Sequence, residues 1–278
     1  MTKQFRYILF VLTVLFATRQ CVCRVADTGL SSEVAVFAYD SSDTIAVPSL
    51  PESLERSIYA HPYSVTYSNP DTHRMWINTG ALSAAFVGSL LALQCLPEDA
   101  TSWNRKEITS KPLFKRWFKN IFKRGPEWDH DKFYFNYMLH PYAGAAYFMG
   151  ARSCGYNMWQ SLLYSACIST IGWEFGVEAF MERPSYQDLF VTPLVGSAIG
   201  EGFYRVKRHI VNNGYRLLGS KFIGEFVAFL VDPVNEFVGL FAGNDARKIA
   251  EYRRRGCSMT MSLMTSVEGR GITFCATF

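Results

Sequence analysis

Several ionisable side chains lie within apolar sequence between residues 128 and 201, and they are the groups of this chain that could do chemistry. Charged groups are costly to bury in apolar surroundings unless they are paired. Their presence there indicates either a hydrogen-bonded structural network or a functional site. The residues concerned are Asp131, His140, Arg152, Glu174, Glu178, Asp188 and Glu201.

Three of these residues could act together as a catalytic or metal-binding group. Glu174 and Glu178 are four residues apart, so both lie on one face of a helix. Paired carboxylates can bind a metal ion, or one of them can hold a proton for acid–base work. His140 could act as a base or as a metal ligand. The alternative is a buried hydrogen-bond network that ties helices together. No HExxH motif specifies a metal, so the cofactor stays unknown.

Asp188 is the fourth catalytic candidate, and it also has a structural interpretation. Residues 185–188 (SYQD) follow a proline and precede an apolar run, which is the pattern of a capping box at a helix start. Asp188 therefore either caps a helix or joins the histidine and the two glutamates. The sequence contains no G-x-S-x-G, P-loop or G-x-G-x-x-G motif that would identify a nucleophile or a nucleotide site.

Residues 113–124 (LFKRWFKNIFKR) show the clearest helical period in the chain. Bulky apolar side chains fall on one half of the helical wheel and cations on the other, which predicts an amphipathic helix lying on an anionic leaflet. The alternative is a basic surface helix whose apolar face packs on the protein's own core. The residues predicted to contact lipid are Trp117, Lys115, Arg116 and Lys119.

Arg152 is added to the lipid-binding candidates because a guanidinium can hold a phosphate through two hydrogen bonds. Its alternative role is to pair with one of the buried carboxylates. Nucleic acid is not an expected partner, because residues 1–23 predict export and an exported protein would not meet nucleic acid.

Residues 75–96 carry no charged side chain over 22 positions, which is long enough to cross a bilayer. Gly80, Ala84 and Gly88 recur every four residues, and small residues at this spacing predict close contact with another helix. A buried hairpin helix is the alternative, because several polar side chains interrupt the segment. Residues 133–151 and 153–173 are likewise almost free of charge and predict helices buried in a bundle inside or upon a membrane.

The first 23 residues have the features of an export signal. Lys3 and Arg6 precede an apolar run of eleven residues, from 7 to 17, which is too short to span a bilayer but typical of a signal peptide. We expect cleavage before Arg24; an uncleaved amphipathic anchor is the alternative.

Composition divides the chain into four parts: a signal peptide (1–23), an extended polar lead-in (24–72), a helical membrane-associated domain (73–250) and a β-hairpin-like tail (251–278). The tail is assigned from its alternation of apolar and polar residues. The predicted fold class is mainly α, a compact bundle of hydrophobic helices with an amphipathic interfacial helix and a short C-terminal β-hairpin.

The sequences WDHDKFYFNYMLHPYAGAAYFMGAR (128–152) and WEFGVEAFMERPSYQDLFVTPLVGSAIGE (173–201) resemble the bacterial envelope family called domain of unknown function 3943. The resemblance covers roughly Trp103 to Tyr204, with a fainter similarity to VanZ-like membrane proteins. It implies a Gram-negative envelope protein. In longer relatives the helical domain precedes what looks like a barrel-forming region, which would begin where this chain ends. The family has no established reaction, so no catalytic role is implied.

These observations favour an uncharacterised cell-envelope membrane protein with a lipid-associated structural or assembly role. The alternative is a lipid- or glycan-modifying enzyme that uses the buried His/Glu/Glu site, with or without a metal. The expected location after export is the outer membrane or its periplasmic face, with the inner membrane as the alternative. The expected partner is membrane lipid, in particular anionic lipid.

Overall fold

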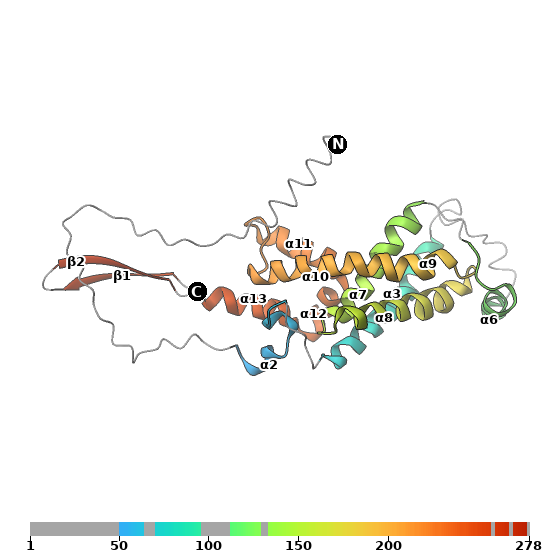
Figure 1. Cartoon of the computed structure of the whole chain (residues 1–278), viewed down its shortest axis with the longest axis horizontal. Coiled ribbons are helices and arrows are strands. Elements are labelled where there is room, and N and C mark those ends of the chain that lie inside the picture. Colours follow the sequence, from blue (N-terminus) through green and yellow to red (C-terminus); the bar gives the residue numbers. More distant parts are fainter. Residues whose placement is uncertain are drawn as a thin grey trace, which may run out of the picture. The chain divides into compact units, whose positions relative to one another are not determined.

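The computed structural model describes residues 50–63, 70–95, 112–128, 133–256, 259–266 and 269–276. The predicted signal peptide, most of the predicted lead-in and Asp131 lie outside these residues. The described chain is mainly helical, as the sequence predicts (Figure 1). Its α-helices are α2 (Glu52–Glu55), α3 (Thr72–Gln94), α6 (Leu113–Phe118), α7 (His140–Arg152), α8 (Met158–Cys167), α9 (Tyr186–Phe190), α10 (Gly196–Asn212), α11 (Lys221–Val231), α12 (Pro233–Ala242) and α13 (Asp245–Gly256).

Short helical segments of other types connect these helices. Two are 3-10 turns, η1 (Ile58–Ala60) and η5 (Glu178–Phe180). The others are π-helical: η2 (Lys119–Arg124), η3 (Phe135–Leu139), η4 (Ile168–Val177) and η6 (Val191–Val195). Because π-helix is rare in proteins and often occurs at functional sites, these four segments indicate where a site could lie.

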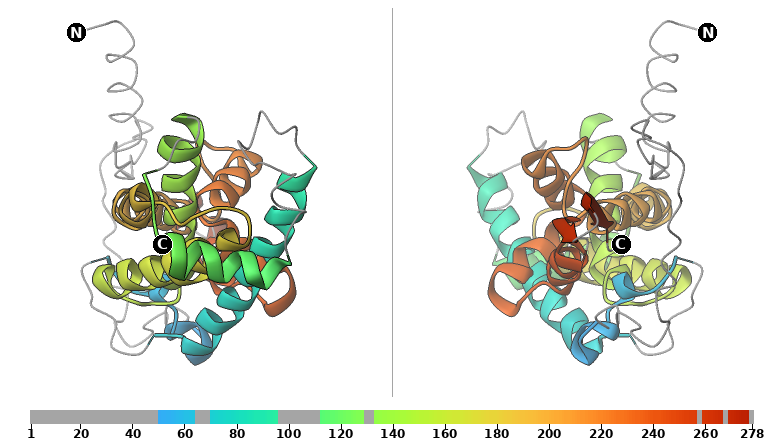
Figure 2. Two further views of the ribbon diagram at one scale, coloured as in Figure 1. Left: turned by 90° about the vertical axis from the view of Figure 1, so that its right-hand side faces the viewer. Right: turned by 90° about the vertical axis from the view of Figure 1, so that its left-hand side faces the viewer.

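Helix α7 is the centre of the helical body and packs against both α8 and α10 (Figures 1 and 2). Its residues 144–152 are all buried. A Cβ on Gly144 would collide with the backbone oxygen of Thr192, and a Cβ on Gly196 would collide with the backbone of Gly144. Glycine is therefore required where η6 and α10 cross α7. Gly200 likewise lies against the ring of Phe148, so the glycines at residues 196 and 200 both allow α10 to pack closely on α7.

Helix α3 packs on the core along one side only. Leu82 and Phe86 enter a buried cluster with Tyr147 of α7, whose ring lies edge-on to Phe86 at 5.5 Å. Gly80 and Gly88 have open space where a Cβ would stand, so the predicted close contact at this stripe is not made within the described part of the chain. Among the described helices, α3 alone has the length and hydropathy needed to cross a membrane.

Helices α11 and α12 turn large apolar side chains outward instead of inward. Small residues such as Gly224 and Ala228 face the protein, where a larger residue at 224 would collide with the backbone of Tyr215. Folded water-soluble domains seldom expose so many neighbouring aromatic side chains. The exposed residues of these two helices are Phe222, Ile223, Phe226, Phe229, Leu230, Phe237, Leu240 and Phe241.

Two strands follow the helices, β1 (Met259–Ser266) and β2 (Gly269–Ala276). They are antiparallel, with Met259 opposite Ala276 and Ser266 opposite Gly269. Their side chains lie outside the described residues, so the hairpin stays a prediction as a packed element. Helix α13 extends to Gly256 and therefore runs past the boundary at residue 250 that composition suggests.

Candidate functional site

His140, Glu174 and Asp188 converge from three different segments. His140 is the first residue of α7, Glu174 lies in η4 and Asp188 lies in α9. A ring nitrogen and one oxygen from each carboxylate lie within 4.8 Å of one another. Glu174 and Asp188 are almost completely buried, and His140 is partly exposed. The tertiary structure thus brings together three of the four side chains predicted to be catalytic.

The start of α9 explains why Asp188 faces the histidine. Ser185 is the N-cap, and its hydroxyl accepts a hydrogen bond from the Asp188 backbone at 3.2 Å, so the predicted cap is confirmed. In a complete capping box the residue at position 188 would accept the N–H of residue 185. Glu174 accepts that N–H instead, at 2.9 Å. The carboxylate of Asp188 is turned to His140, with 3.8 Å between Oδ1 and Nδ1.

Each member of this cluster lies in or beside a π-helical segment. Segment η3 ends immediately before His140, η4 contains Glu174, and η6 begins three residues after Asp188. Thr192, in η6, places its hydroxyl oxygen 3.2 Å from His140 Nδ1. The wider π turn rotates the following side chains relative to an α-helix, and such turns recur at functional sites.

Glu178 is the fourth predicted catalytic residue, and it stands beside the cluster. Burial raises the pKa of its carboxyl well above the usual value, and the negative charges of Glu174, Glu182 and Asp188 raise it further. Both effects favour the protonated form of this carboxyl, which is the form that acts as a general acid. Glu178 is the first residue of η5, whereas Glu174 lies four residues earlier in η4 and accepts the backbone N–H of Ser185.

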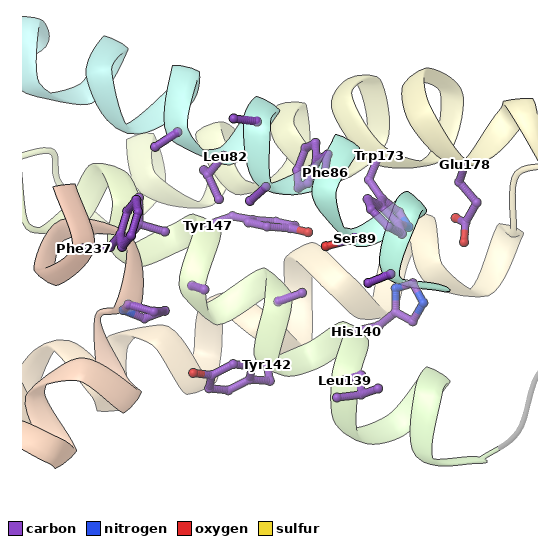
Figure 3. A pocket seen from close by; sticks show the side chains of 18 of the residues that line it. Leu82, Phe86, Ser89, Leu139, His140, Tyr142, Tyr147, Trp173, Glu178 and Phe237 are labelled. Carbon is purple, nitrogen blue, oxygen red and sulfur yellow. The ribbon is translucent and has the colours of Figure 1, made fainter. Parts of the chain in front are cut away.

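A cavity of about 840 Å³ opens beside these groups. Figure 3 shows His140 and Glu178 at one end and Phe237 at the other. Glu182 also lines the cavity, but most of the wall is apolar and comes from α3, α7, η4 and α12. An apolar pocket with a few convergent polar groups is the usual form of a small-molecule site.

Trp173 adds a polar feature to the cavity wall. Its ring packs edge-on against Phe86 at 5.3 Å. Its indole nitrogen is buried and has no hydrogen-bond partner among the described residues. A buried N–H group without a partner costs roughly 1–3 kcal/mol.

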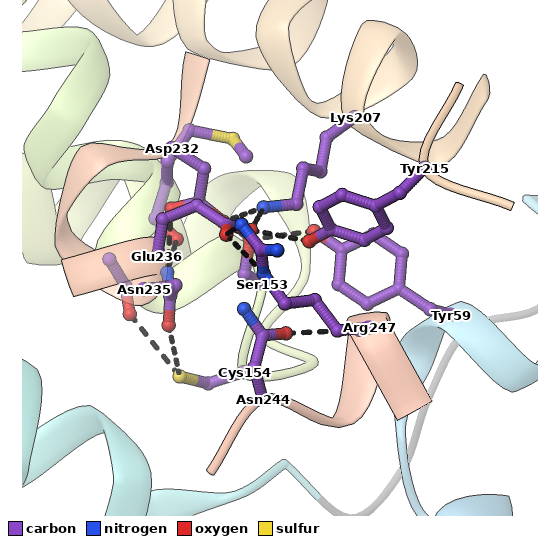
Figure 4. A network of polar contacts seen from close by, with 12 residues as sticks. Tyr59, Ser153, Cys154, Lys207, Tyr215, Asp232, Asn235, Glu236, Asn244 and Arg247 are labelled. Atoms are coloured by element: carbon purple, nitrogen blue, oxygen red, sulfur yellow. Dashed lines mark hydrogen bonds and ion pairs between the residues drawn. The ribbon is translucent and has the colours of Figure 1, made fainter. Parts of the chain in front are cut away.

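A second buried polar network lies among α7, α10, α12 and α13 (Figure 4). Lys207 of α10 forms ion pairs with Asp232 and Glu236, and all three side chains are almost fully buried. Burial alone would raise the pKa of Glu236, but Lys207, Tyr215 and Arg247 outweigh it and lower the pKa to about 2. This network could not be predicted from the sequence, because Lys207 stands in a basic stretch typical of a solvated face.

The amphipathic segment 113–124 is helical as predicted, but two side chains of its polar face, Arg116 and Asn120, are turned inward. Arg116 is buried and donates to the carbonyl of Phe180, so its prediction as a lipid contact is wrong. Asn120 donates to the carbonyls of Ala179 and Glu182, both at 3.0 Å. These side chains donate hydrogen bonds to backbone carbonyls at the end of η5 that have no partner within the helix. They therefore act as a C-terminal cap that comes from another helix.

The remaining lipid candidates of this segment divide in the same way. The indole N–H of Trp117 donates to the carbonyl of Phe175 at 2.8 Å, so its polar edge faces the protein. Lys115 is exposed and Lys119 partly exposed. The aromatic rings of Phe114, Phe118 and Phe122, which follow one another every four residues, face outward. The alternative in which this apolar face packs on the protein's core is therefore wrong for these three rings.

Arg152 is also removed from the lipid contacts. Its Nε donates to Glu201 at 3.0 Å, and its guanidinium lies 3.8 Å from the ring centre of Tyr204. It is buried, so pairing with a carboxylate, the alternative role, is confirmed.

Comparison with known proteins supports the family resemblance. Residues 125–234 match the family described as Domain of unknown function (DUF3943). The match begins later and ends later than the resemblance in the sequence motifs suggests, and it includes all four residues predicted to be catalytic, His140, Glu174, Glu178 and Asp188. No curated protein and no solved structure matches the chain.

Proposed function

Residues 125–234 match the DUF3943 family, whose description assigns no activity, and we propose a function from the site itself. The protein is a membrane-embedded enzyme of the cell envelope that binds a lipid-like molecule and modifies its polar end. The observation that carries this proposal is the cavity of about 840 Å³, which joins a largely apolar wall to a buried cluster of ionisable groups.

The groups at the polar end have complementary acid–base character. The raised pKa of Glu178 keeps a proton available for a leaving group. His140, oriented by Thr192, can accept a proton from a hydroxyl or a water molecule. The reaction class supported by this arrangement is transfer or hydrolysis at a lipid head group.

The surface supports a membrane location. The outward rings of α11 and α12 and the rings of α6 and η2 include Phe114, Phe222 and Phe241, each between 77% and 80% exposed. A lipid environment removes the cost of exposing these rings to water. Helix α3 is the segment proposed to cross the bilayer. Export to the envelope, with the outer membrane favoured over the inner, rests on residues 1–23 and is proposed on that basis.

Occupancy of the cavity by lipid can be tested by substitutions on one helix. Ala85 is exposed and lines the cavity, whereas Val87 is exposed and does not line it. We expect native mass spectrometry of the detergent-purified protein to show bound lipid, which Ala85→Trp removes and Val87→Trp retains. The same lipid, incubated with wild type, should change mass, and His140→Ala or Glu178→Gln should prevent the change. Lipid bound equally by both tryptophan variants would refute the proposal.

A non-enzymatic role in membrane organisation is the second candidate, favoured by the outward rings of Phe114, Phe118 and Phe122 beside Lys115. Such a helix suits the interface of an anionic leaflet. If this role alone is correct, serine at the three ring positions abolishes the cellular phenotype of the protein, while His140→Ala leaves it unchanged. Recovery of tagged protein from separated inner and outer membranes tests the proposed location.

A further inference from the structure

We infer that His140, Glu174 and Asp188 bind one divalent transition-metal ion, in a site that opens on the apolar cavity. The three side chains offer one imidazole nitrogen and two carboxylate oxygens. This mixture of donors suits ions such as Zn²⁺ and Mn²⁺. The inference goes beyond the proposed function, which requires no metal, and it makes His140 a ligand in place of a base.

The distances between the ligand atoms of the cluster fit coordination of one shared ion better than direct hydrogen bonds between the side chains. The 3.8 Å between His140 Nδ1 and Asp188 Oδ1 is too long for a hydrogen bond. Ligands about 2.0–2.2 Å from one ion lie about 3–4 Å from each other. The widest separation in the cluster, within 4.8 Å, closes to this range by a small side-chain rotation. The hydroxyl hydrogen of Thr192 can rotate away from the ring, leaving a nitrogen for the ion.

The electrostatics of the site also favour a cation. Glu174 and Asp188 are at most 2% exposed, and Glu178 is buried beside them. Carboxylates gathered in a region of low dielectric repel one another strongly. A divalent ion at their centre would neutralise two of them and replace repulsion by coordination.

Neighbouring groups hold the two carboxylates in place. The backbone N–H of Ser185 donates to Glu174, and the Ser185 hydroxyl accepts from the Asp188 backbone. The strand-like bridge between Glu127 and Ser185 fixes the same loop from the other side. Outer partners of this kind orient metal ligands and strengthen binding.

The site has the form of a catalytic metal centre rather than a closed structural one. Three protein ligands leave a coordination position free, whereas structural zinc sites use four. His140 and Glu178 both line the cavity, so the free position would face the space proposed for the lipid. A water molecule or a substrate oxygen could occupy that position.

Metal titration of the full chain tests the inference. The protein is purified in detergent, stripped with chelator and titrated with Zn²⁺ and Mn²⁺ separately, with bound metal measured by mass spectrometry after equilibrium dialysis. We expect one equivalent bound by wild type and binding weaker by more than about 100-fold in His140→Ala, Glu174→Gln and Asp188→Asn, since even outer partners contribute about 10- to 100-fold. His209→Ala is the matched control, because His209 is exposed on α10.

Folding of each variant is checked by circular dichroism and thermal melting. Three ligand variants are compared, so that the test survives if one of them unfolds. A rise in Tm with metal in wild type that is absent in folded Asp188→Asn would support the site. Equal binding by wild type and all three variants, or no binding by folded wild type, would overturn it. Lipid retention in the Ala85→Trp experiment is measured in parallel, so failure of the metal site and failure of the lipid proposal are distinguished.

Discussion

The buried ammonium of Lys207 is expected to be one of the main contributors to stability. Its Nζ pairs with Glu236 and lies 3.6 Å from Asp232 Oδ2, and all three side chains are about 1% exposed. Lys207→Met keeps the length of the side chain and removes its charge. Asp232 and Glu236 then remain buried near each other without the ammonium between them.

The magnitude follows from the burial of both partners. Removing one partner of a buried pair costs about 3–5 kcal/mol. Arg247 still contacts Glu236 at 2.7 Å in the variant, so we expect a value near the lower limit, about 3 kcal/mol. For a chain of this size that is a fall in Tm of roughly 6–12 °C. Adding Asp232→Asn to Lys207→Met should restore part of the loss, because it removes one uncompensated charge.

Thermal unfolding in detergent, followed by tryptophan fluorescence, measures this effect. Lys248→Met is the matched control, because Lys248 pairs with Asp245 at 2.9 Å while more than half of its side chain is exposed. An exposed pair contributes at most about 1 kcal/mol, so this variant should melt within a few degrees of wild type. If the Tm of Lys207→Met equals that of the control, the network does not stabilise the fold.

Three further predictions concern acid stability, helix packing and the amphipathic segment. The folded pKa of Glu236, about 2, lies below the usual value of 4.5. The stabilising contribution of this carboxylate is therefore complete above pH 4.5 and is lost as pH falls towards 2. In denaturant titrations across this range, the free energy of unfolding of wild type should fall by up to about 3 kcal/mol more than that of Glu236→Gln. Gly144→Ala should unfold the protein or lower its Tm by at least about 6 °C, since a Cβ there meets backbone, whereas Gly80→Ala, which has open space, should melt as wild type or slightly higher. Arg116→Ala should lower Tm without weakening binding to vesicles that contain anionic lipid. Lys115→Ala should weaken binding to these vesicles without lowering Tm. Weaker vesicle binding by folded Arg116→Ala would show that Arg116 contacts the lipid.

Local patterns in the sequence predicted much of the helical fold. The charge-free segments form α3, α7 and α8 with η4. A long apolar run with helical spacing pairs its backbone N–H and C=O groups most readily within a helix. The N-cap at Ser185 was also predictable, since it depends on a few residues close together in the chain.

The faces of the helices were harder to predict. In segment 113–124 the hydrophobic pattern places the arginine and the asparagine on the solvent side, yet Arg116 and Asn120 face the protein. They do so because open carbonyls at the end of η5 need donors, and these carbonyls lie about 60 residues further along the chain. Lys207 is a similar case, since its partners Asp232 and Glu236 come from α12.

What the sequence determined by itself is the helical class of the fold and the identity of the ionisable residues in apolar surroundings. What only the tertiary structure decided is which of them meet. Glu174 and Glu178 seemed a natural pair because they share a helix face, but His140 and Asp188 approach Glu174 and leave Glu178 at the cavity wall. The reason is physical: residues 140, 174 and 188 are joined by the contact of Ser185 with Glu174 and by the crossing of Gly144 with Thr192, and contacts between distant segments leave no periodic pattern in the sequence.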